Sequence, residues 1–223
     1  MAKNISYYHE PKYLFVVLIL RRVLIYKNII MKHLVILAHH NSKSSFCAAV
    51  AKARVESLKE RDLEVKFVSL SDDNFNPLLG AKDFEYMAKG DYAPDVKPYM
   101  ELIKWADKIS VVFPMWWGTM PALMKGFFDR VLAYGFAYKY GENGVEGLLK
   151  GKRAEAIVTT GNPHDYLLEH NIIKALDNDL KVSIFEFCGI EYKQTHYFNA
   201  VTSITNEERE IMLKQIYTWK SDK

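Results

Sequence analysis

Cysteine is scarce in this chain, which has only Cys47 and Cys188 among its 223 residues. Two cysteines cannot supply the disulfide framework that small secreted domains use in place of a large core. Neither cysteine stands at a metal-ligand spacing, so the sequence predicts no metal site. This cysteine usage is typical of a reducing compartment, and we expect the protein to be cytoplasmic.

The chain also lacks a strong excess of charge of either sign, since its formal net charge is +3. Residues 1–30 hold five basic side chains against one acidic side chain, a balance of +4 that leaves −1 for residues 31–223. Nucleic-acid-binding domains carry clustered basic side chains, because phosphate contacts dominate their affinity. The nearly neutral main domain therefore excludes nucleic acid as an expected partner.

No apolar run is long enough for a transmembrane segment, which takes about 20 residues. Residues 13–20 are apolar, but Arg21 and Arg22 interrupt the run, and no small-residue cleavage site of a signal peptide follows it. We expect residues 1–30 to be an extension upstream of a natural start at Met31, and residues 31–223 to form the functional domain. The alternative is a membrane-surface anchor over residues 1–30, and the N-terminus of the protein made from its native gene distinguishes the two.

Two phosphate-binding motifs, GxxxxGK[ST] and GxGxxG, are missing, so neither a P-loop nor a dinucleotide-binding Rossmann site is predicted. The chain has instead a regular alternation of strand and helix patterns. Apolar or alternating runs predict strands at residues 33–38, 63–70, 109–113, 154–160 and 192–198. Helical spacing predicts helices at residues 45–58, 95–106, 121–132, 166–187 and 206–219. Residues 71–91 are expected to be irregular, and the glycines at 141–147 to mark a flexible stretch.

Strands that alternate with helices predict one α/β domain, a doubly wound five-stranded parallel sheet with helices on both faces. The closing helix has a capping box, because Thr205 precedes it and Glu208 follows three residues later.

The most informative segment is residues 111–132, VVFPMWWGTMPALMKGFFDRVL. Pro114 ends the strand, since its ring fixes φ and removes a backbone donor. Trp116 and Trp117 then occupy a strand-to-helix turn, where two adjacent indoles cannot both enter one core. We expect at least one of them to line a cleft or an interface, where a flat ligand could lie on it. The alternative is that both fill the top of the core.

Three loops follow strand ends, at residues 39–45, 114–120 and 161–166. In a doubly wound sheet such loops meet at the carboxyl edge, where ligands bind. The first loop precedes a helix with a good N-cap at Ser44 or Ser45, so free N–H groups favour a phosphate there. The second loop offers flat aromatic side chains, and the third offers threonine and glycine backbone with a tyrosine. A flavin needs this combination of a phosphate grip, a stacking wall and hydrogen bonds to the edge of its ring.

The segments LVILAH, SSFC, FNP, FPMWWGTMPALMKGFFDRVL, GFAYKYG, LLKGKRA, TTG and CGIEY occur in this order between Met31 and about residue 220. In these segments the chain resembles the flavodoxin-fold NAD(P)H:quinone oxidoreductases, a group that includes ancillary subunits of glutathione-gated potassium efflux systems. The resemblance implies a flavodoxin-like domain that binds FAD, with FMN as the alternative, and uses NAD(P)H as co-substrate. It further implies a homodimer with each active site at the subunit boundary.

The resemblance also assigns residues to the flavin. Those implied are His39, Ser45, Phe46 and Cys47 at the phosphates, Pro114, Met115, Trp116, Trp117 and Gly118 at the isoalloxazine, and Thr159, Thr160 and Gly161 at its other edge. The chain departs from the family at Cys47, where an asparagine is usual, and in TTGNP, which replaces TTGG.

Tyr166 and His170 are similar to a tyrosine and a histidine beside the substrate in that family. Because they are four residues apart, they share one face if the segment is helical. We predict that both are catalytic, with Tyr166, aided by His170, donating a hydrogen bond to the oxygen where negative charge develops. The alternatives are ordinary packing for Tyr166 and an exposed histidine without a role for His170.

The predicted reaction is the two-electron reduction of a quinone by NAD(P)H, with ping-pong kinetics because donor and acceptor share one site. The aromatic residues at 127–138 are the expected apolar patch of the homodimer. One alternative, an electron-transfer flavodoxin, is disfavoured because the TxTGxT phosphate loop is missing and the domain is not strongly acidic. A second alternative, a regulatory subunit of a potassium efflux transporter, stays open.

Overall fold

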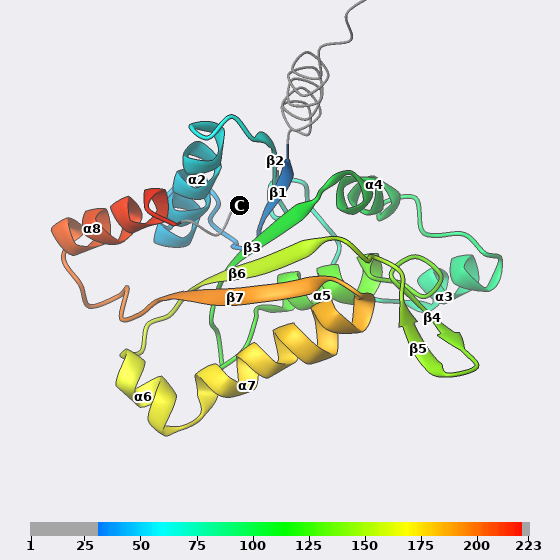
Figure 1. The fold of residues 1–223 in the computed structure, drawn as a ribbon. Helices are drawn as coiled ribbons and strands as arrows, with labels where there is room; N and C mark the ends of the chain where they lie inside the picture. The colour runs from blue at the N-terminus through cyan, green and yellow to red at the C-terminus, as the bar shows by residue number, and fades with distance from the viewer. Residues whose placement is uncertain (1–30, 220–223) are drawn as a thin grey trace, which may run out of the picture. The chain divides into compact units, whose positions relative to one another are not determined.

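A computed structural model describes residues 31–219, and the predicted extension over residues 1–30 lies outside them. Five parallel strands form one sheet in the order β2–β1–β3–β6–β7 (Figure 1). Their bounds are Lys32–Leu37 for β1, Glu64–Ser69 for β2, Lys108–Pro114 for β3, Arg153–Thr159 for β6 and Glu191–Phe198 for β7. The predicted five-stranded parallel sheet is therefore confirmed.

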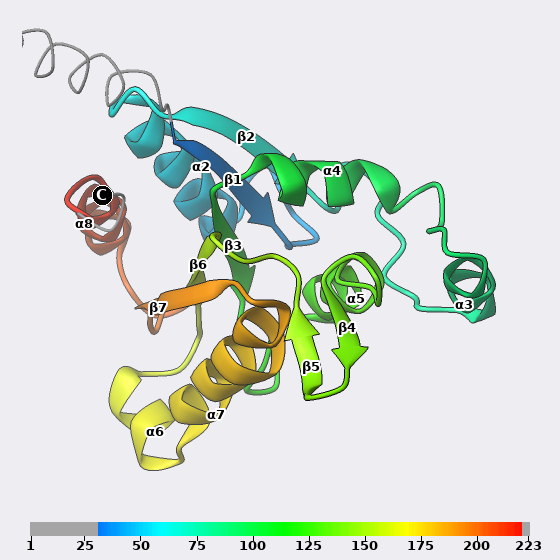
Figure 2. The ribbon, with the colours of Figure 1, turned by 45° about the vertical axis from the view of Figure 1, so that its right-hand side comes forward.

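Helices cover both faces of the sheet, as predicted. One face packs against α2 (Phe46–Lys59) and α8 (Asn206–Tyr217), and the other against α4 (Lys97–Trp105), α5 (Ala122–Val131) and α7 (Ile172–Asn178). Because side chains alternate along a strand, Val112 joins the core under α2 while its neighbours Val111 and Phe113 join the core on the other face. Figure 2 shows α2 and α5 on opposite sides of β3.

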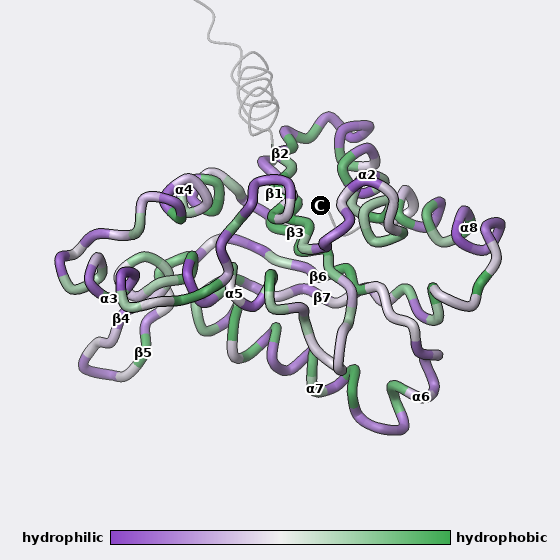
Figure 3. The backbone as a smooth tube through the Cα atoms, turned by 180° about the vertical axis from the view of Figure 1, so that it is seen from behind, coloured by the Kyte–Doolittle hydropathy of each residue, from purple (hydrophilic) through white to green (hydrophobic). Residues whose placement is uncertain are grey.

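Both faces of a covered parallel strand are apolar, so the central strands are nearly continuous hydrophobic runs. Every residue of β3 is buried. In Figure 3, β3 is largely hydrophobic, whereas hydrophilic and hydrophobic stretches alternate along the helices. Within residues 31–219, no helix combines the length and the hydropathy needed to cross a membrane.

The predicted helix caps are present. The Ser45 hydroxyl accepts a hydrogen bond from the Ala48 N–H at 3.1 Å and so fixes the start of α2. At α8, the Glu208 N–H donates to the Thr205 hydroxyl at 3.2 Å, and the Thr205 N–H donates to the Glu208 carboxylate at 2.7 Å. These two bonds form the expected capping box.

Two local predictions were wrong. Residues 71–91, expected to be irregular, contain helix α3 (Ala81–Ala88), and the glycine-rich stretch forms an antiparallel hairpin of β4 (Tyr138–Gly141) and β5 (Gly144–Gly147). The segment at 166–187 is mainly helical, as expected, and is divided into α6 (His164–Glu169), α7, the π-helical η1 (Asp179–Phe185) and the short η2 (Glu186–Cys188). The division falls at Asn171, whose φ of 55° lies in the left-handed region and ends the first helix.

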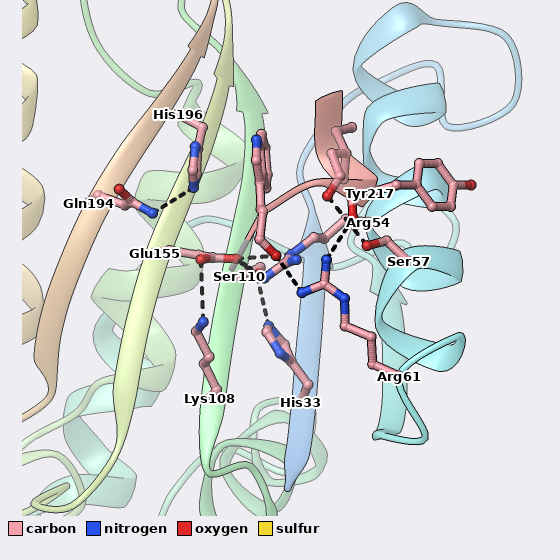
Figure 4. A network of polar contacts seen from close by, with 12 residues as sticks. His33, Arg54, Ser57, Arg61, Lys108, Ser110, Glu155, Gln194, His196 and Tyr217 are labelled. Carbon is pink, nitrogen blue, oxygen red and sulfur yellow. Dashed lines mark hydrogen bonds and ion pairs between the residues drawn. The ribbon is translucent and has the colours of Figure 1, made fainter. Parts of the chain in front are cut away.

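A buried polar cluster ties three strands and one helix together (Figure 4). The Glu155 carboxylate on β6 accepts hydrogen bonds from Arg54 Nη2 on α2 at 2.7 Å and from Ser110 Oγ on β3 at 2.6 Å. Lys108 Nζ lies 3.5 Å from its other oxygen. Because the Ser110 proton points at Glu155, His33 Nε2 on β1 is the donor in its 2.7 Å contact with Ser110 Oγ.

All five side chains of this cluster are buried. Burial alone would raise the pKa of Glu155, but the charges of Arg54 and Lys108 outweigh it and hold that pKa below its ordinary value. A buried carboxylate with two cationic partners is costly to disturb, since removing it leaves their charges uncompensated.

We expect Glu155→Gln to lower the free energy of unfolding by about 3–5 kcal/mol at pH 7, because the isosteric amide keeps the shape but removes the charge. The measurement is urea denaturation followed by circular dichroism. The matched control is Glu146→Gln, since Glu146 pairs with Lys139 and Lys150 on the surface. That change is expected to leave the free energy of unfolding close to that of the wild type, because exposed ion pairs contribute little.

The same pair of proteins tests the sign of the pKa shift. A depressed folded-state pKa stabilises the protein above the unfolded carboxyl pKa, about 4.3 for Glu, and this stabilisation is lost as the pH falls through the lower folded value. The difference between wild type and Glu155→Gln should therefore shrink below about pH 4. A difference under 1 kcal/mol at pH 7, no larger than that of the control, contradicts the prediction.

Candidate functional site

A cavity of about 700 Å³ lies at the carboxyl ends of β1, β3 and β6, within the usual size range of small-molecule sites. The residues that line it come from the predicted loops and from two further segments: His39, Ser45, Phe46, Cys47, Pro114, Met115, Trp116, Trp117, Gly118, Thr159, Thr160, Gly161, Asn162, Tyr166, Ile172, Val201 and Thr202. The structure thus brings together all twelve residues expected at the flavin and one of the two expected catalytic residues. His170 does not line the cavity.

Four lining residues were missed by the sequence reasoning. Asn162 lies inside the third predicted loop, and Val201 and Thr202 follow β7. Ligands bind at the carboxyl ends of parallel strands, and this rule, applied to the last strand as well, would have found Val201 and Thr202. Ile172 enters from α7, and its place follows only from the helix break at Asn171.

Backbone hydrogen bonds between strand ends hold the loops in place. Pro114 pairs with Thr159, and the Met115 N–H donates to the Thr159 carbonyl at 2.7 Å. The Val201 N–H donates to the Thr160 carbonyl at 3.0 Å. The segments that form the walls of the cavity are therefore held by backbone hydrogen bonds that extend the pairing of the strands beyond their ends.

The N-terminus of α2 opens into the cavity through Ser45, Phe46 and Cys47. Within the described residues, the N–H groups of Phe46 and Cys47 have no hydrogen-bond acceptor, as expected for the first turn of a helix. These groups and the helix dipole favour an anion.

His39 presents a defined nitrogen to the same region. The Asn41 N–H donates to His39 Nδ1 at 2.9 Å, so the proton of the neutral ring is on Nε2. Burial, and to a smaller extent the neighbouring His40, lower the pKa of His39. The ring is therefore neutral at pH 7 in the free protein and can donate through Nε2.

The Cys47 thiol lines the cavity as a neutral group. Burial raises its pKa to about 12, against a smaller opposite effect of the Thr159 side chain. The remaining lining residues include no lysine, arginine, aspartate or glutamate. Any phosphate in this cavity would be held by N–H groups, hydroxyls and the His39 imidazole, with no lysine or arginine beside it.

The two tryptophans occupy a strained turn at the rim. Trp116 and Thr119 exchange backbone hydrogen bonds of 3.0 and 3.1 Å, which close a two-residue turn. Its central residues, Trp117 and Gly118, have φ values of 54° and 76°. Positive φ at both positions defines a type I′ turn, which favours Asn and Gly and disfavours a bulky residue.

The turn holds the side chain of Trp117 fully exposed at the cavity rim, and Trp116 is 43% exposed. The Trp116 ring lies 6.1 Å from that of His39 and 5.8 Å from that of His40. The prediction that at least one indole lines a cleft is met by both.

Tyr166 projects from α6 and is 46% exposed. The His170 ring stacks on the Tyr166 ring with centroids 4.3 Å apart and planes 29° apart, and His170 Nδ1 lies 2.9 Å from the Tyr166 carbonyl oxygen. The expected shared face is therefore present, with the two side chains in contact. Over residues 31–219, no cluster of three or more metal-ligating side chains occurs.

Comparison with known proteins decides the family. A family model described as the flavodoxin-like fold matches residues 31–219, which include all five strands and the cavity. The chain belongs to the flavodoxin-like fold family.

Members of the flavodoxin-like fold family similar to this chain carry oxidoreductase names. A Haemophilus influenzae protein called "Uncharacterized NAD(P)H oxidoreductase" is 37% identical over 185 residues, which are 82% of this chain and 91% of that protein. The rat NAD(P)H dehydrogenase [quinone] 1 is 29% identical over 86% of this chain and 76% of its own length. Among solved structures, a Bacillus anthracis FMN-dependent NADH-azoreductase in complex with FMN superposes with a TM-score of 0.67 at 24% identity, covering 84% of this chain and 96% of that one.

The strained turn yields a prediction about stability. We expect Trp117→Asn to raise the free energy of unfolding by about 0.5–1 kcal/mol, because asparagine tolerates the left-handed region and the exposed indole buries nothing in the free protein. Guanidinium denaturation of the protein without ligand measures it. Trp116→Asn is the control, since no positive φ is relieved there and partly buried surface is lost. A destabilised Trp117→Asn protein contradicts the strain argument.

Proposed function

We propose that this protein is a flavin-dependent NAD(P)H:quinone oxidoreductase. The observation that carries the proposal is the cavity itself, in which a helix N-terminus, two exposed indoles and a Thr–Thr–Gly edge face one another. The names of the Haemophilus influenzae and rat relatives support the same activity. Both cysteines are free thiols, in keeping with a cytoplasmic protein.

The described residues fit a flavin. The cavity is large enough for its ring system and phosphate end, and the free N–H groups of Phe46 and Cys47 with His39 Nε2 suit an anion. Trp116 and Trp117 suit a flat ring, and the backbone of Thr159–Gly161 suits its polar edge. The cofactor is FAD in this proposal, with FMN as the alternative that the Bacillus anthracis protein binds.

When bound, the flavin would supply hydride transfer between NAD(P)H and the acceptor. The chain's own contribution is orientation and electrostatics. The exposed indoles keep one side of the cavity apolar, and the Tyr166 hydroxyl donates a hydrogen bond to the acceptor oxygen as negative charge develops there. Because one cavity serves donor and acceptor in turn, the kinetics are ping-pong.

Flavin binding is expected to tighten as the pH falls from 8 to 6.5. His39 is neutral in the free protein, and a phosphate anion beside Nε2 favours its charged form, so binding takes up a proton. We expect FAD affinity to rise about 3- to 10-fold over this interval, as measured by fluorescence titration. His39→Asn should weaken binding and remove the pH dependence.

The matched control is His40→Asn, which alters the neighbouring histidine that does not line the cavity. It should retain the pH dependence. A protein that is purified colourless and gains no thermal stability from either FAD or FMN contradicts the proposed cofactor altogether.

The role of Tyr166 is tested by steady-state oxidation of NADH and NADPH with a benzoquinone. Parallel-line kinetics are expected for the wild type, and Tyr166→Phe should lose about 10-fold in kcat/KM for the quinone, the scale of about 1.4 kcal/mol of transition-state stabilisation. Tyr86→Phe, on α3 and outside the cavity lining, is the control. An absence of quinone-dependent oxidation would favour the electron-transfer flavodoxin or the transporter subunit.

The proposed assembly is a homodimer, but its apolar surface differs from the predicted one. Of residues 127–138, Phe127, Phe128 and Phe136 are buried core, and Tyr134 alone is an exposed aromatic. Exposed apolar side chains come instead from Leu78, Leu79, Phe84, Tyr140, Val182 and Phe187. Two of them, Leu79 and Phe187, line a second cavity of about 390 Å³ between α5 and η1. Large exposed apolar surface of this kind marks interfaces.

Sedimentation at micromolar concentration is expected to give a dimer. Leu79→Glu should shift the equilibrium towards monomer, because it places a charge in the proposed apolar interface. Ile211→Glu, an exposed apolar residue on α8, is the control for a general effect of added charge. A wild-type monomer at these concentrations contradicts the assembly.

A further inference from the structure

Tyr166 is held at the cavity by very little core packing. Its helix, α6, has six residues, and Leu167 is the buried one among them. Tyr166 is 46% exposed, so only part of its surface packs against the rest of the protein. Another contact is therefore needed to fix the orientation of the Tyr166 hydroxyl toward a ligand in the cavity.

The His170 ring supplies that support. The left-handed Asn171 ends the helix directly after His170, and the imidazole lies against the Tyr166 ring with centroids 4.3 Å apart. The Nδ1 atom donates to the Tyr166 carbonyl at 2.9 Å, which fixes the plane of the imidazole. One residue thus contacts both the backbone and the side chain of Tyr166.

The same geometry argues against a proton relay. A relay needs a hydrogen bond between the imidazole and the Tyr166 hydroxyl, whereas the two rings lie face to face. Within the described residues, His170 Nδ1 bonds to the Tyr166 carbonyl, and the His170 backbone N–H donates to the carbonyls of Tyr166 and Leu168. His170 also lies outside the cavity lining.

We infer that His170 is a positioning residue, which orients the Tyr166 phenol by stacking and passes no proton during the reaction. This inference rests on the proposed function, because it concerns the residue proposed to donate a hydrogen bond to the acceptor. It replaces the predicted catalytic role of His170 by a role exerted through Tyr166.

Three substitutions separate the contributions of the His170 ring, of its hydrogen bond to the Tyr166 carbonyl and of its exchangeable proton. His170→Phe keeps a flat ring without a donor, His170→Gln keeps a donor without a ring, and His170→Ala keeps neither. Reduction of the bound flavin by NADH and kcat/KM for a benzoquinone are measured for each. The His170→Phe protein should keep most of the wild-type kcat/KM for the quinone, whereas His170→Gln and His170→Ala should each lose about 3- to 10-fold, since small misplacements of a positioned group slow reactions strongly.

In a Tyr166→Phe background, His170→Ala should cause no further loss, because there is no hydroxyl left to orient. Reduction by NADH should change less than twofold in all three variants. A His170→Phe protein as slow as His170→Ala overturns the inference in favour of the titratable imidazole. A His170→Gln protein as fast as wild type also overturns it, because then the helix-end hydrogen bond alone suffices.

A measurement that needs no enzymatic turnover tests the role of His170 independently of the proposed function. In protein with ¹³C-labelled tyrosine rings, the Tyr166 signal is assigned by its absence in Tyr166→Phe. Stacking should displace this signal in wild type and His170→Phe, and the displacement should vanish in His170→Ala and His170→Gln. An unchanged Tyr166 signal in His170→Ala overturns the stacking, whereas a wild type that oxidises no NAD(P)H but shows the displacement overturns the proposed function alone.

Discussion

The ionised carboxylate of Glu155 is the constraint on which the rest of the structure depends. It is buried on β6, and its partners come from β3 and from the middle of α2. Because Arg54 lies eight residues after Phe46, the ion pair fixes α2 about 12 Å from its N-terminus. An apolar contact would allow the helix to slide along the sheet, whereas a charge pair with fixed partners does not. The helix N-terminus is thereby set against Thr159, the last residue of the same strand.

Two residues at or beside the cavity have backbone conformations that non-glycine residues seldom adopt. Trp117 and Asn171 are both left-handed, and each stands next to a residue of the site. At Trp117, the left-handed conformation leaves the indole exposed to solvent. At Asn171, it ends the helix directly after His170, whose ring stacks on Tyr166. Strain of this kind persists because the surrounding ladder bonds, such as that between Trp116 and Thr119, overdetermine the local geometry.

Sequence reasoning worked where one physical rule dominates. Buried parallel strands are apolar throughout, caps use few residue types, and strand ends in a doubly wound sheet converge, so the sheet and most of the cavity lining could be predicted. The buried cluster could not, because Arg54 and Glu155 resemble surface charges until their partners are known. The break at Asn171 and the burial of Phe127 and Phe136 also depend on tertiary packing, which local patterns do not encode.

The electrostatics of the site follow from where the charges are placed. The buried cationic side chains Arg54 and Lys108 lie in the Glu155 cluster. The cavity is lined instead by backbone dipoles and by groups that are neutral at pH 7 in the free protein, His39 and Cys47 among them. A phosphate there would be stabilised by oriented backbone N–H groups. Their positions are fixed by the helix, whereas the charge on a lysine or arginine side chain is mobile. Since Arg54 and Glu155 join α2 to β6, the same ion pair also holds the N–H groups of Phe46 and Cys47 at the cavity.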